Sequence, residues 1–120
     1  MNKKKSSNPI NPATNKPYRL IIDSQEQFVS LVNSENNNYW NLENLLITCP
    51  ISFNKTLFTW NVSFSQSTFL KKIAFYKVEF MKTADFSFVQ FSWDVDFAWV
   101  VFKWNATFGW WNFLGITIHL

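Results

Sequence analysis

The sequence predicts a mainly β protein, a β-solenoid. The main observation is a phenylalanine ladder in which the gaps between successive rings alternate between five and six residues without a break. A second apolar column, of smaller or branched residues, follows the same rhythm two positions before every other ring. The ladder consists of Phe53, Phe58, Phe64, Phe69, Phe75, Phe80, Phe86, Phe91, Phe97, Phe102, Phe108 and Phe113, and Leu42 and Ile47 extend it backwards.

Neither a helix nor a flat strand can use this spacing. Steps of about 500° and 600° would scatter the rings around a helix axis. In a flat strand, odd and even gaps would send successive rings to opposite faces. A coiled ribbon with one large apolar residue on each short side accommodates both gaps, which indicates a solenoid.

Written as eleven-residue units, the ladder region shows further columns. The smaller inward column contains Ile51, Val62, Ile73, Ala84, Val95 and Ala106. Residues suited to turns often precede the first Phe of a unit, namely Ser63, Asp85, Asp96 and Thr107. The six-residue step carries Asn61, Lys72, Thr83, Asp94 and Asn105 at the position where we expect the extra corner residue.

Residues 42–118 resemble the pentapeptide-repeat family, in a variant with alternating five- and six-residue steps. The segments 83–86, 95–97 and 106–108 carry the resemblance most clearly, because each places Phe directly after an apolar and a polar residue. The resemblance implies a right-handed, quadrilateral parallel β-helix with the rings stacked inside. Four sides of alternating length then give about 22 residues per coil, and three to four coils between residues 42 and 120.

The N-terminal third is expected to contain a tail and a cap. Residues 1–17 form a basic, proline-containing segment that is predicted to be disordered. Residues 18–41 are predicted to cover the open end of the solenoid with a strand near 18–22 and a helix at about 25–33. Ser24 and Gln27 form the capping-box pattern that begins this helix.

The last repeat departs from the pattern. Trp111 replaces a small inward residue, and His119 stands where the next ladder Phe is expected. The sequence then stops at Leu120 without an obvious polar cap. Two interpretations stay open: truncation relative to related chains, or an apolar C-terminal end that associates with a second copy.

Composition limits the environment. The formal net charge is +3, and the only cysteine, Cys49, excludes an intramolecular disulfide framework, so a cytoplasmic location is expected. Residues 1–7 are basic, but no apolar signal segment follows them. Residues 104–120 are uncharged but short for a membrane span and continue the ladder, so an integral membrane protein is not predicted.

The sequence contains no residue set for catalysis, and we predict a protein that is not an enzyme. The only histidine, His119, is expected several coils away from Cys49. Asp94 and Asp96 are interpreted as solvated turn residues. Because metal-ligand spacing and glycine-rich phosphate loops are missing, no cofactor and no metal are expected.

Outward aromatic residues accumulate in the C-terminal half, and we treat them as a candidate interaction face. Those residues are Phe88, Trp93, Trp99, Trp104 and Trp110. A 22-residue coil also places Lys82 between Trp60 and Trp104, Lys77 next to Trp99, and Lys71 next to Trp93, as candidate cation–π pairs. The plainer interpretation is that stacked aromatic residues only hold neighbouring coils together.

A non-catalytic scaffold or protein-interaction module is the leading hypothesis, with an unknown protein partner or self-association through the C-terminal end. The family resemblance offers a DNA-mimic modulator of type II topoisomerases as an alternative, but that role requires a negative surface and the solenoid carries Lys55, Lys71, Lys72, Lys77, Lys82 and Lys103. Nucleic-acid binding or membrane-surface binding through Lys and Trp faces are further alternatives without a sequence motif. The last alternative is a shortened reading frame whose product has no separate function.

Overall fold

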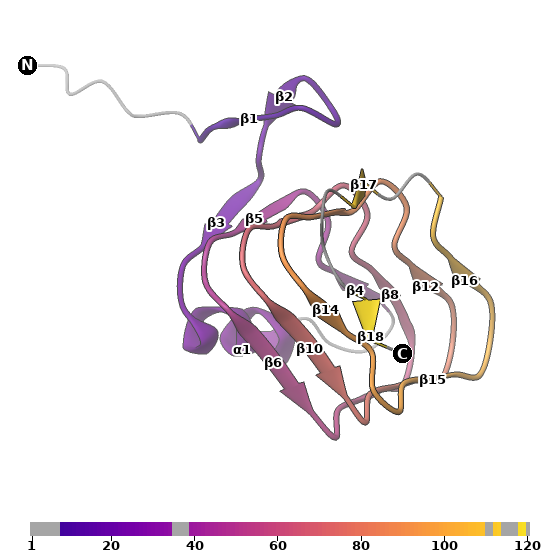
Figure 1. Ribbon diagram of the computed structural model, residues 1–120. Helices are drawn as coiled ribbons and strands as arrows, with labels where there is room; N and C mark the ends of the chain where they lie inside the picture. The colour runs from indigo at the N-terminus through magenta and orange to yellow at the C-terminus, as the bar shows by residue number, and fades with distance from the viewer. Residues whose placement is uncertain (1–7, 35–38, 110–111, 114–117, 120) are drawn as a thin grey trace, which may run out of the picture.

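The computed structural model describes residues 8–34, 39–109, 112–113 and 118–119, with only the backbone of the last two ranges. Within these residues the chain winds through four parallel sheets that enclose a phenylalanine core (Figure 1). The predicted four-sided parallel β-helix with a strand and helix at its N-terminal end is therefore confirmed.

The chain visits four sides in a fixed order, which we number accordingly. The first side consists of β4 (Tyr39–Asn41), β8 (Asn61–Ser63), β12 (Ala84–Asp85) and β16 (Ala106–Thr107). The second consists of β3 (Leu20–Ile22), β5 (Leu45–Ile47), β9 (Thr68–Phe69), β13 (Gln90–Phe91) and β17 (Asn112–Phe113). The third consists of β6 (Ile51–Asn54), β10 (Ile73–Tyr76), β14 (Val95–Asp96) and β18 (Ile118–His119). The fourth consists of β7 (Leu57–Phe58), β11 (Glu79–Phe80) and β15 (Val101–Phe102).

The register between coils is set by the ladder. Ile73 pairs with Ile51 on one edge and with Val95 on the other, so one coil takes 22 residues as predicted. The last described coil is longer, because Val95 pairs with Ile118. His119 consequently pairs with Asp96 rather than with Phe97. The expectation that His119 takes the next ladder position is wrong by one residue.

The ladder rings stack in columns, one column for each side. Stacked pairs have centroid distances of 5.0–5.5 Å and interplanar angles of 17° or less, in the columns Phe53–Phe75–Phe97, Phe58–Phe80–Phe102, Phe64–Phe86–Phe108 and Phe69–Phe91. Rings of different columns meet edge to face, as Phe58 and Phe64 do at 85°. Leu42 and Ile47 are fully buried below the columns. The side chain of Phe113 lies outside the described residues.

The corners that need a positive φ all occur inside the five-residue steps of the solenoid. One residue per unit has a φ of 55–66°, namely Asn44, Lys55, Gln66, Lys77, Phe88 and Trp99. Each follows the first ladder residue by two positions, and in three units the next amide closes a turn by donating to that ladder carbonyl: Ser67 to Phe64, Val89 to Phe86, and Val100 to Phe97. This geometry is that of a type II turn, whose third residue needs a positive φ.

The turn residues before the ladder rings support these corners. Asp85 Oδ1 accepts a hydrogen bond from the Ser87 amide at 2.8 Å, and Asp96 Oδ1 accepts one from the Ala98 amide at 2.9 Å. Ser63 Oγ accepts from the Ser65 amide in the same way. Short polar side chains therefore stabilise the corners at positions where the sequence predicts turn residues.

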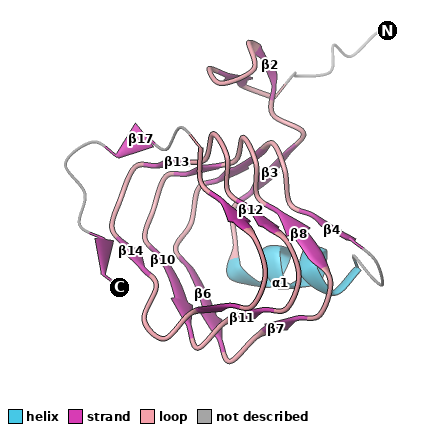
Figure 2. Ribbon diagram, turned by 90° about the vertical axis from the view of Figure 1, so that its right-hand side faces the viewer, coloured by secondary structure: helices cyan, strands magenta, loops and turns pink. Residues whose placement is uncertain are grey.

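The helix α1 (Gln25–Ser34) covers the N-terminal end of the solenoid (Figures 1 and 2). Ser24 Oγ accepts a hydrogen bond from the Gln27 amide at 3.1 Å, and the Gln27 side chain accepts one from the Asp23 amide at 2.9 Å. The capping box is thus present, with the second bond made one residue earlier than in the usual motif. Phe28 is buried against Phe53, with ring centroids 5.4 Å apart.

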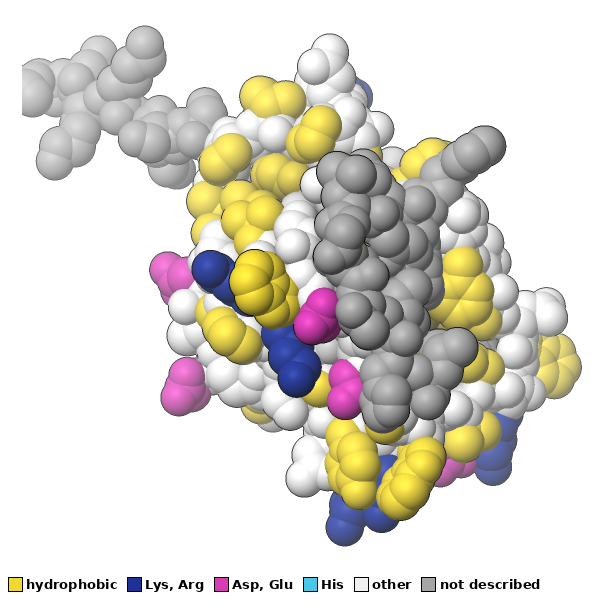
Figure 3. Space-filling view, in the orientation of Figure 1, with side chains coloured by type: hydrophobic (Ala, Val, Ile, Leu, Met, Phe, Trp, Pro, Cys, Tyr) yellow, Lys and Arg dark blue, Asp and Glu magenta, His cyan; other side chains and the backbone are white. Residues whose placement is uncertain are grey.

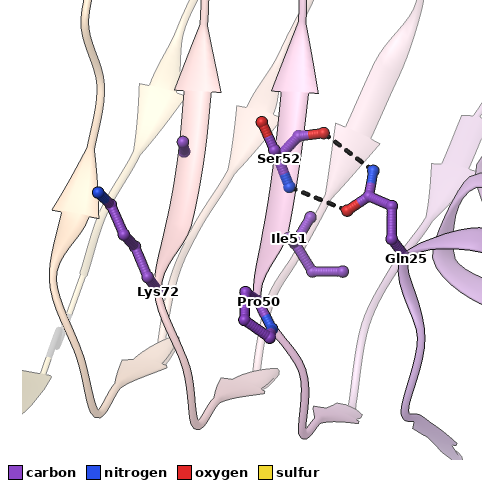
Figure 4. Close-up of a pocket in the computed structure, with 6 residues that line it drawn as sticks. Gln25, Pro50, Ile51, Ser52 and Lys72 are labelled. Carbon is purple, nitrogen blue, oxygen red and sulfur yellow. Dashed lines mark hydrogen bonds between the residues drawn. The ribbon is translucent and has the colours of Figure 1, made fainter.

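The open edge of β6 is completed by a side chain. The side-chain Nε2 of Gln25 donates a hydrogen bond to the Ser52 backbone carbonyl at 2.9 Å. The side-chain Oε1 of Gln25 accepts one from the Ser52 backbone amide at 3.0 Å. The side-chain amide thereby occupies the place of a neighbouring strand, as Figure 4 shows. The Trp40 indole N–H donates a hydrogen bond to the Val32 carbonyl at 3.0 Å, which links the C-terminal turn of α1 to β4.

Residues 8–17 are ordered, contrary to the disorder expected for 1–17. They contain a hairpin of β1 (Ile10–Asn11) and β2 (Lys16–Pro17), which pair antiparallel. The Asn11 side chain is buried and donates to the Asn44 side chain and the Gln66 carbonyl, both at 2.8 Å. Tertiary hydrogen bonds thus overcome a polar, proline-rich composition. Residues 1–7 lie outside the described residues.

Candidate interaction face

The predicted face residues do not share one face. Phe88 lies between β12 and β13, Trp93 between β13 and β14, Trp99 between β14 and β15, and Trp104 between β15 and β16. Each therefore occupies a different corner of the same coil. All four are exposed, by 47%, 55%, 68% and 62%. The prediction of a single face is corrected to two pairs on opposite sides, and Trp110 lies outside the described residues.

The fourth side carries the larger apolar surface, which we call the fourth-side face. Its exposed large hydrophobic residues are Leu57, Trp60, Tyr76, Trp99, Val101 and Trp104. Leu57 and Val101 lie on the sheet, and the aromatic residues lie at its two flanking corners. In Figure 3, hydrophobic and basic side chains gather along the lower edge, where Figure 1 places β15.

Lys82 forms one aromatic lane of this face. Its ammonium lies 5.5 Å from the ring centroid of Trp60 and 5.7 Å from that of Trp104. These residues are spaced by one coil each, so the cation lies between two rings as predicted. Cation–π attraction is worth about 0.5–1 kcal/mol at an exposed site, so the lane favours the observed positions of both rings.

Lys77 forms the second lane. Its ammonium lies 4.9 Å from the Trp99 ring and 5.4 Å from the Tyr76 ring. The rings of Tyr76 and Trp99 are themselves 5.8 Å apart. Trp99 is also one of the corner residues, with a φ of 60°. A bulky side chain in that conformation is strained, and such strain is often found at binding sites.

The fourth-side face is basic. The segments 54–61, 76–83 and 98–105 that form it carry Lys55, Lys77, Lys82 and Lys103 against the single acid Glu79. Lys103 Nζ lies 3.1 Å from Glu79 Oε1, in an exposed ion pair. The face therefore presents an excess of positive charge to a partner.

The opposite, second side is partly covered by the N-terminal segment. The Tyr18 hydroxyl and the Thr68 hydroxyl are hydrogen-bonded at 2.7 Å, and both residues are buried. Phe88 and Trp93 flank this side. Among the described residues, no cation–π contact joins Lys71 to Trp93, so that predicted pair is not formed.

A cavity of about 270 Å³ opens on the third side, next to the helix (Figure 4). Gln25, Pro50, Ile51, Ser52, Lys72 and Ala74 line it. Its only ionisable side chain is Lys72, and Gln25 is fully engaged with Ser52. The cavity therefore offers no acid–base pair.

Cys49 is half-buried, and partial burial raises the pKa of its thiol, with a smaller contribution from the negative charge of Asp23. Fewer thiolates at neutral pH make a poor nucleophile. Across the described part of the chain, no group of three or more His, Cys, Asp or Glu side chains could hold a metal ion. No helix in the same residues is long and apolar enough to cross a membrane.

Sequence reasoning found Trp99 and Trp104 but missed the rest of the fourth-side face. Leu57, Tyr76 and Val101 were not grouped with them, because the 22-residue register shows which outward residues stack in one lane but not to which side a lane belongs. That assignment requires the positions of the corners, which the structure supplies. Comparison with family models, curated proteins and solved structures gave no match.

Proposed function

We propose that this protein is a non-catalytic scaffold or interaction module of the pentapeptide-repeat kind, and that the fourth-side face is its docking surface. The observation that supports this most is the gathering of Leu57, Trp60, Tyr76, Trp99, Val101 and Trp104, all exposed, on one side of the solenoid. Several large exposed apolar residues on one side commonly mark a contact site. Trp and Tyr are also the side chains that contribute most to binding energy.

Two further observations favour binding over chemistry. Contacts with Lys77 and Lys82 favour one orientation of the rings on the face before any partner arrives, which reduces the entropy lost on binding. The thiol of Cys49, by contrast, has a raised pKa. The lysine excess also weighs against the DNA-mimic alternative, which needs a negative surface. We keep the cytoplasm as the proposed location, because a single cysteine suits a reducing compartment.

Site-specific photo-crosslinking tests this function in the cells that express the protein. A benzophenone amino acid replaces Val101 on β15 of the fourth-side face, and a matched variant carries it at Gln90 on the second side. We expect a cross-linked product, either a protein or a lipid, from position 101 and none from position 90. Equal products from both positions, or none from position 101, would contradict the proposed docking surface.

A further inference from the structure

We propose that the surface docked by the fourth-side face is an anionic lipid bilayer. This inference rests on the proposed docking function and names the partner by its chemistry: a flat, negatively charged, amphipathic surface. The argument has three steps, concerning the backbone, the side chains and the charge.

The backbone of this side is suited to contact with lipid because its middle strand is paired on both edges. Glu79 and Met81 donate to the carbonyls of Thr56 and Phe58, each at 2.9 Å. Val101 and Lys103 donate in turn to Val78 and Phe80, at 3.0 and 2.9 Å. Polar backbone groups that are already bonded cost little when water is removed from them.

The side chains are arranged by the depth at which each type rests in a bilayer interface. The aliphatic residues Leu57 and Val101 lie on the two outer strands of the side, and Glu79, ion-paired with Lys103, lies between them on the middle strand. Trp60, Trp104, Tyr76 and Trp99 flank them at both corners. Aromatic rings of this kind favour the level of the lipid head groups, and Lys side chains extend their ammonium groups outward to the phosphates. Lys77 and Lys82 lie against those rings, so cation and ring would reach the head groups together.

The charge of the face selects an anionic surface. Four lysines lie in the three segments that build it, and the single acid, Glu79, is already paired with Lys103 at 3.1 Å. Basic patches are attracted to the acidic lipids of the cytoplasmic leaflet, over a distance set by the ionic strength. The lysines of two copies would repel each other, which disfavours a second copy docking face to face.

The aliphatic residues of the face argue against single-stranded nucleic acid. Proteins that bind single strands combine stacking rings with basic residues along the backbone. Leu57 and Val101 would gain nothing from contact with phosphates. An acidic protein surface fits the charge, and the experiment separates it from lipid.

The test measures co-sedimentation of the full chain with large unilamellar vesicles. Vesicles of phosphatidylcholine with about 30% phosphatidylserine are compared with pure phosphatidylcholine, in about 50 mM and 500 mM salt. We expect binding to the acidic vesicles at low salt, with a partition coefficient at least about tenfold lower in high salt or without phosphatidylserine.

Variants locate the contact. The double substitution Trp99→Ser with Trp104→Ser is expected to lower the partition coefficient about tenfold, because it removes both interfacial rings. Lys77→Gln with Lys82→Gln should lower it only for acidic vesicles. The control is Trp93→Ser, another exposed ring, which flanks the opposite side, and it should bind like wild type. Thermal unfolding by circular dichroism verifies that all variants remain folded.

Failure of the lipid proposal can be distinguished from failure of the docking function. Binding to neither vesicle type, or an equal loss for Trp93→Ser and for the Trp99/Trp104 double variant, would overturn the lipid proposal. Tighter retention of the chain on a thymidine 20-mer than on acidic vesicles would overturn it as well. If vesicles fail while crosslinking from position 101 yields an acidic protein, lipid is wrong and docking stands. If both fail, the docking surface is wrong too.

Discussion

The ring of Phe75 stacks on the ring of Phe97 with a centroid distance of 5.1 Å and an interplanar angle of 5°. The two residues are 22 positions apart, one full coil, and both are buried. Each column of rings repeats this relationship, so parallel aromatic stacks run through the core, with smaller aliphatic residues such as Ile73 and Val95 buried beside them. Stability should therefore depend strongly on individual ladder rings.

We expect Phe86→Ala to lower the free energy of unfolding by about 3–5 kcal/mol, because the cavity it leaves cannot be filled by neighbouring stacked rings. Phe86 is fully buried, with Phe64 at 5.0 Å and Phe108 at 5.5 Å in its column. Urea denaturation followed by circular dichroism measures the change. The matched control is the exposed neighbour Phe88→Ala, which should cost much less. A loss below about 1 kcal/mol at Phe86 would contradict the role of the ladder.

The ladder was predictable because it depends only on period. Alternating gaps of five and six residues fix which rings face inward, and the 22-residue coil then fixes the pairing of Ile73 with Ile51. The hairpin at residues 8–17 was not predictable, because it depends on hydrogen bonds from Asn11 to residues 33 and 55 positions away. No local pattern in the sequence announces such contacts.

The positive-φ corners were not predicted, because their residues carry no turn signal. Among the six corner residues with a φ of 55–66°, only Asn44 is of a type that commonly adopts this conformation, while Lys55, Lys77 and Trp99 are not. The solenoid imposes the conformation on whatever residue the sequence supplies. This explains how bulky aromatic residues come to occupy two of the corners.

We expect Phe88→Gly to be more stable than Phe88→Ala by about 1 kcal/mol, because only the glycine adopts a φ of 59° without a steric penalty. The order should be reversed at Gln90 in strand β13, where glycine costs about 0.5–1 kcal/mol relative to alanine. Chemical denaturation of the four variants measures both differences. The same preference for alanine at both positions would mean that the corner at Phe88 is not strained.

The lane between Trp60 and Trp104 predicts a measurable coupling. In a double-mutant cycle with Lys82→Gln and Trp104→Leu, we expect an interaction free energy of about 0.5–1 kcal/mol. The control cycle uses Lys71→Gln and Trp93→Leu, a pair with the same 22-residue spacing but no cation–π contact. Its coupling should be close to zero. Equal couplings in the two cycles would show that spacing alone, and not the observed contact, produces the effect.

The candidate face was only half predictable for a related reason. Trp99 and Trp104 stand out in the sequence as large outward residues, but adjacent outward residues lie on adjacent corners of a square coil. The side to which each belongs depends on where the corners fall, and the corners were the least visible feature of the sequence. Once Lys77 and Trp99 are known to be corner residues, the grouping with Val101 follows directly.

The bonds between Gln25 and Ser52 predict how the N-terminal end is closed. Removing both with Gln25→Ala should destabilise the protein by about 1–3 kcal/mol, because each hydrogen bond contributes about 0.5–1.5 kcal/mol net. The Ser52 amide, which donates to Gln25 at 3.0 Å, should also exchange its hydrogen faster in the variant. The Ile73 amide, which donates to the Asp94 carbonyl at the next strand, should keep its wild-type protection from local opening. The control Ser30→Ala changes an exposed residue of the same helix. If Gln25→Ala left the exchange of Ser52 unchanged, the side-chain amide would not be what closes the edge of β6.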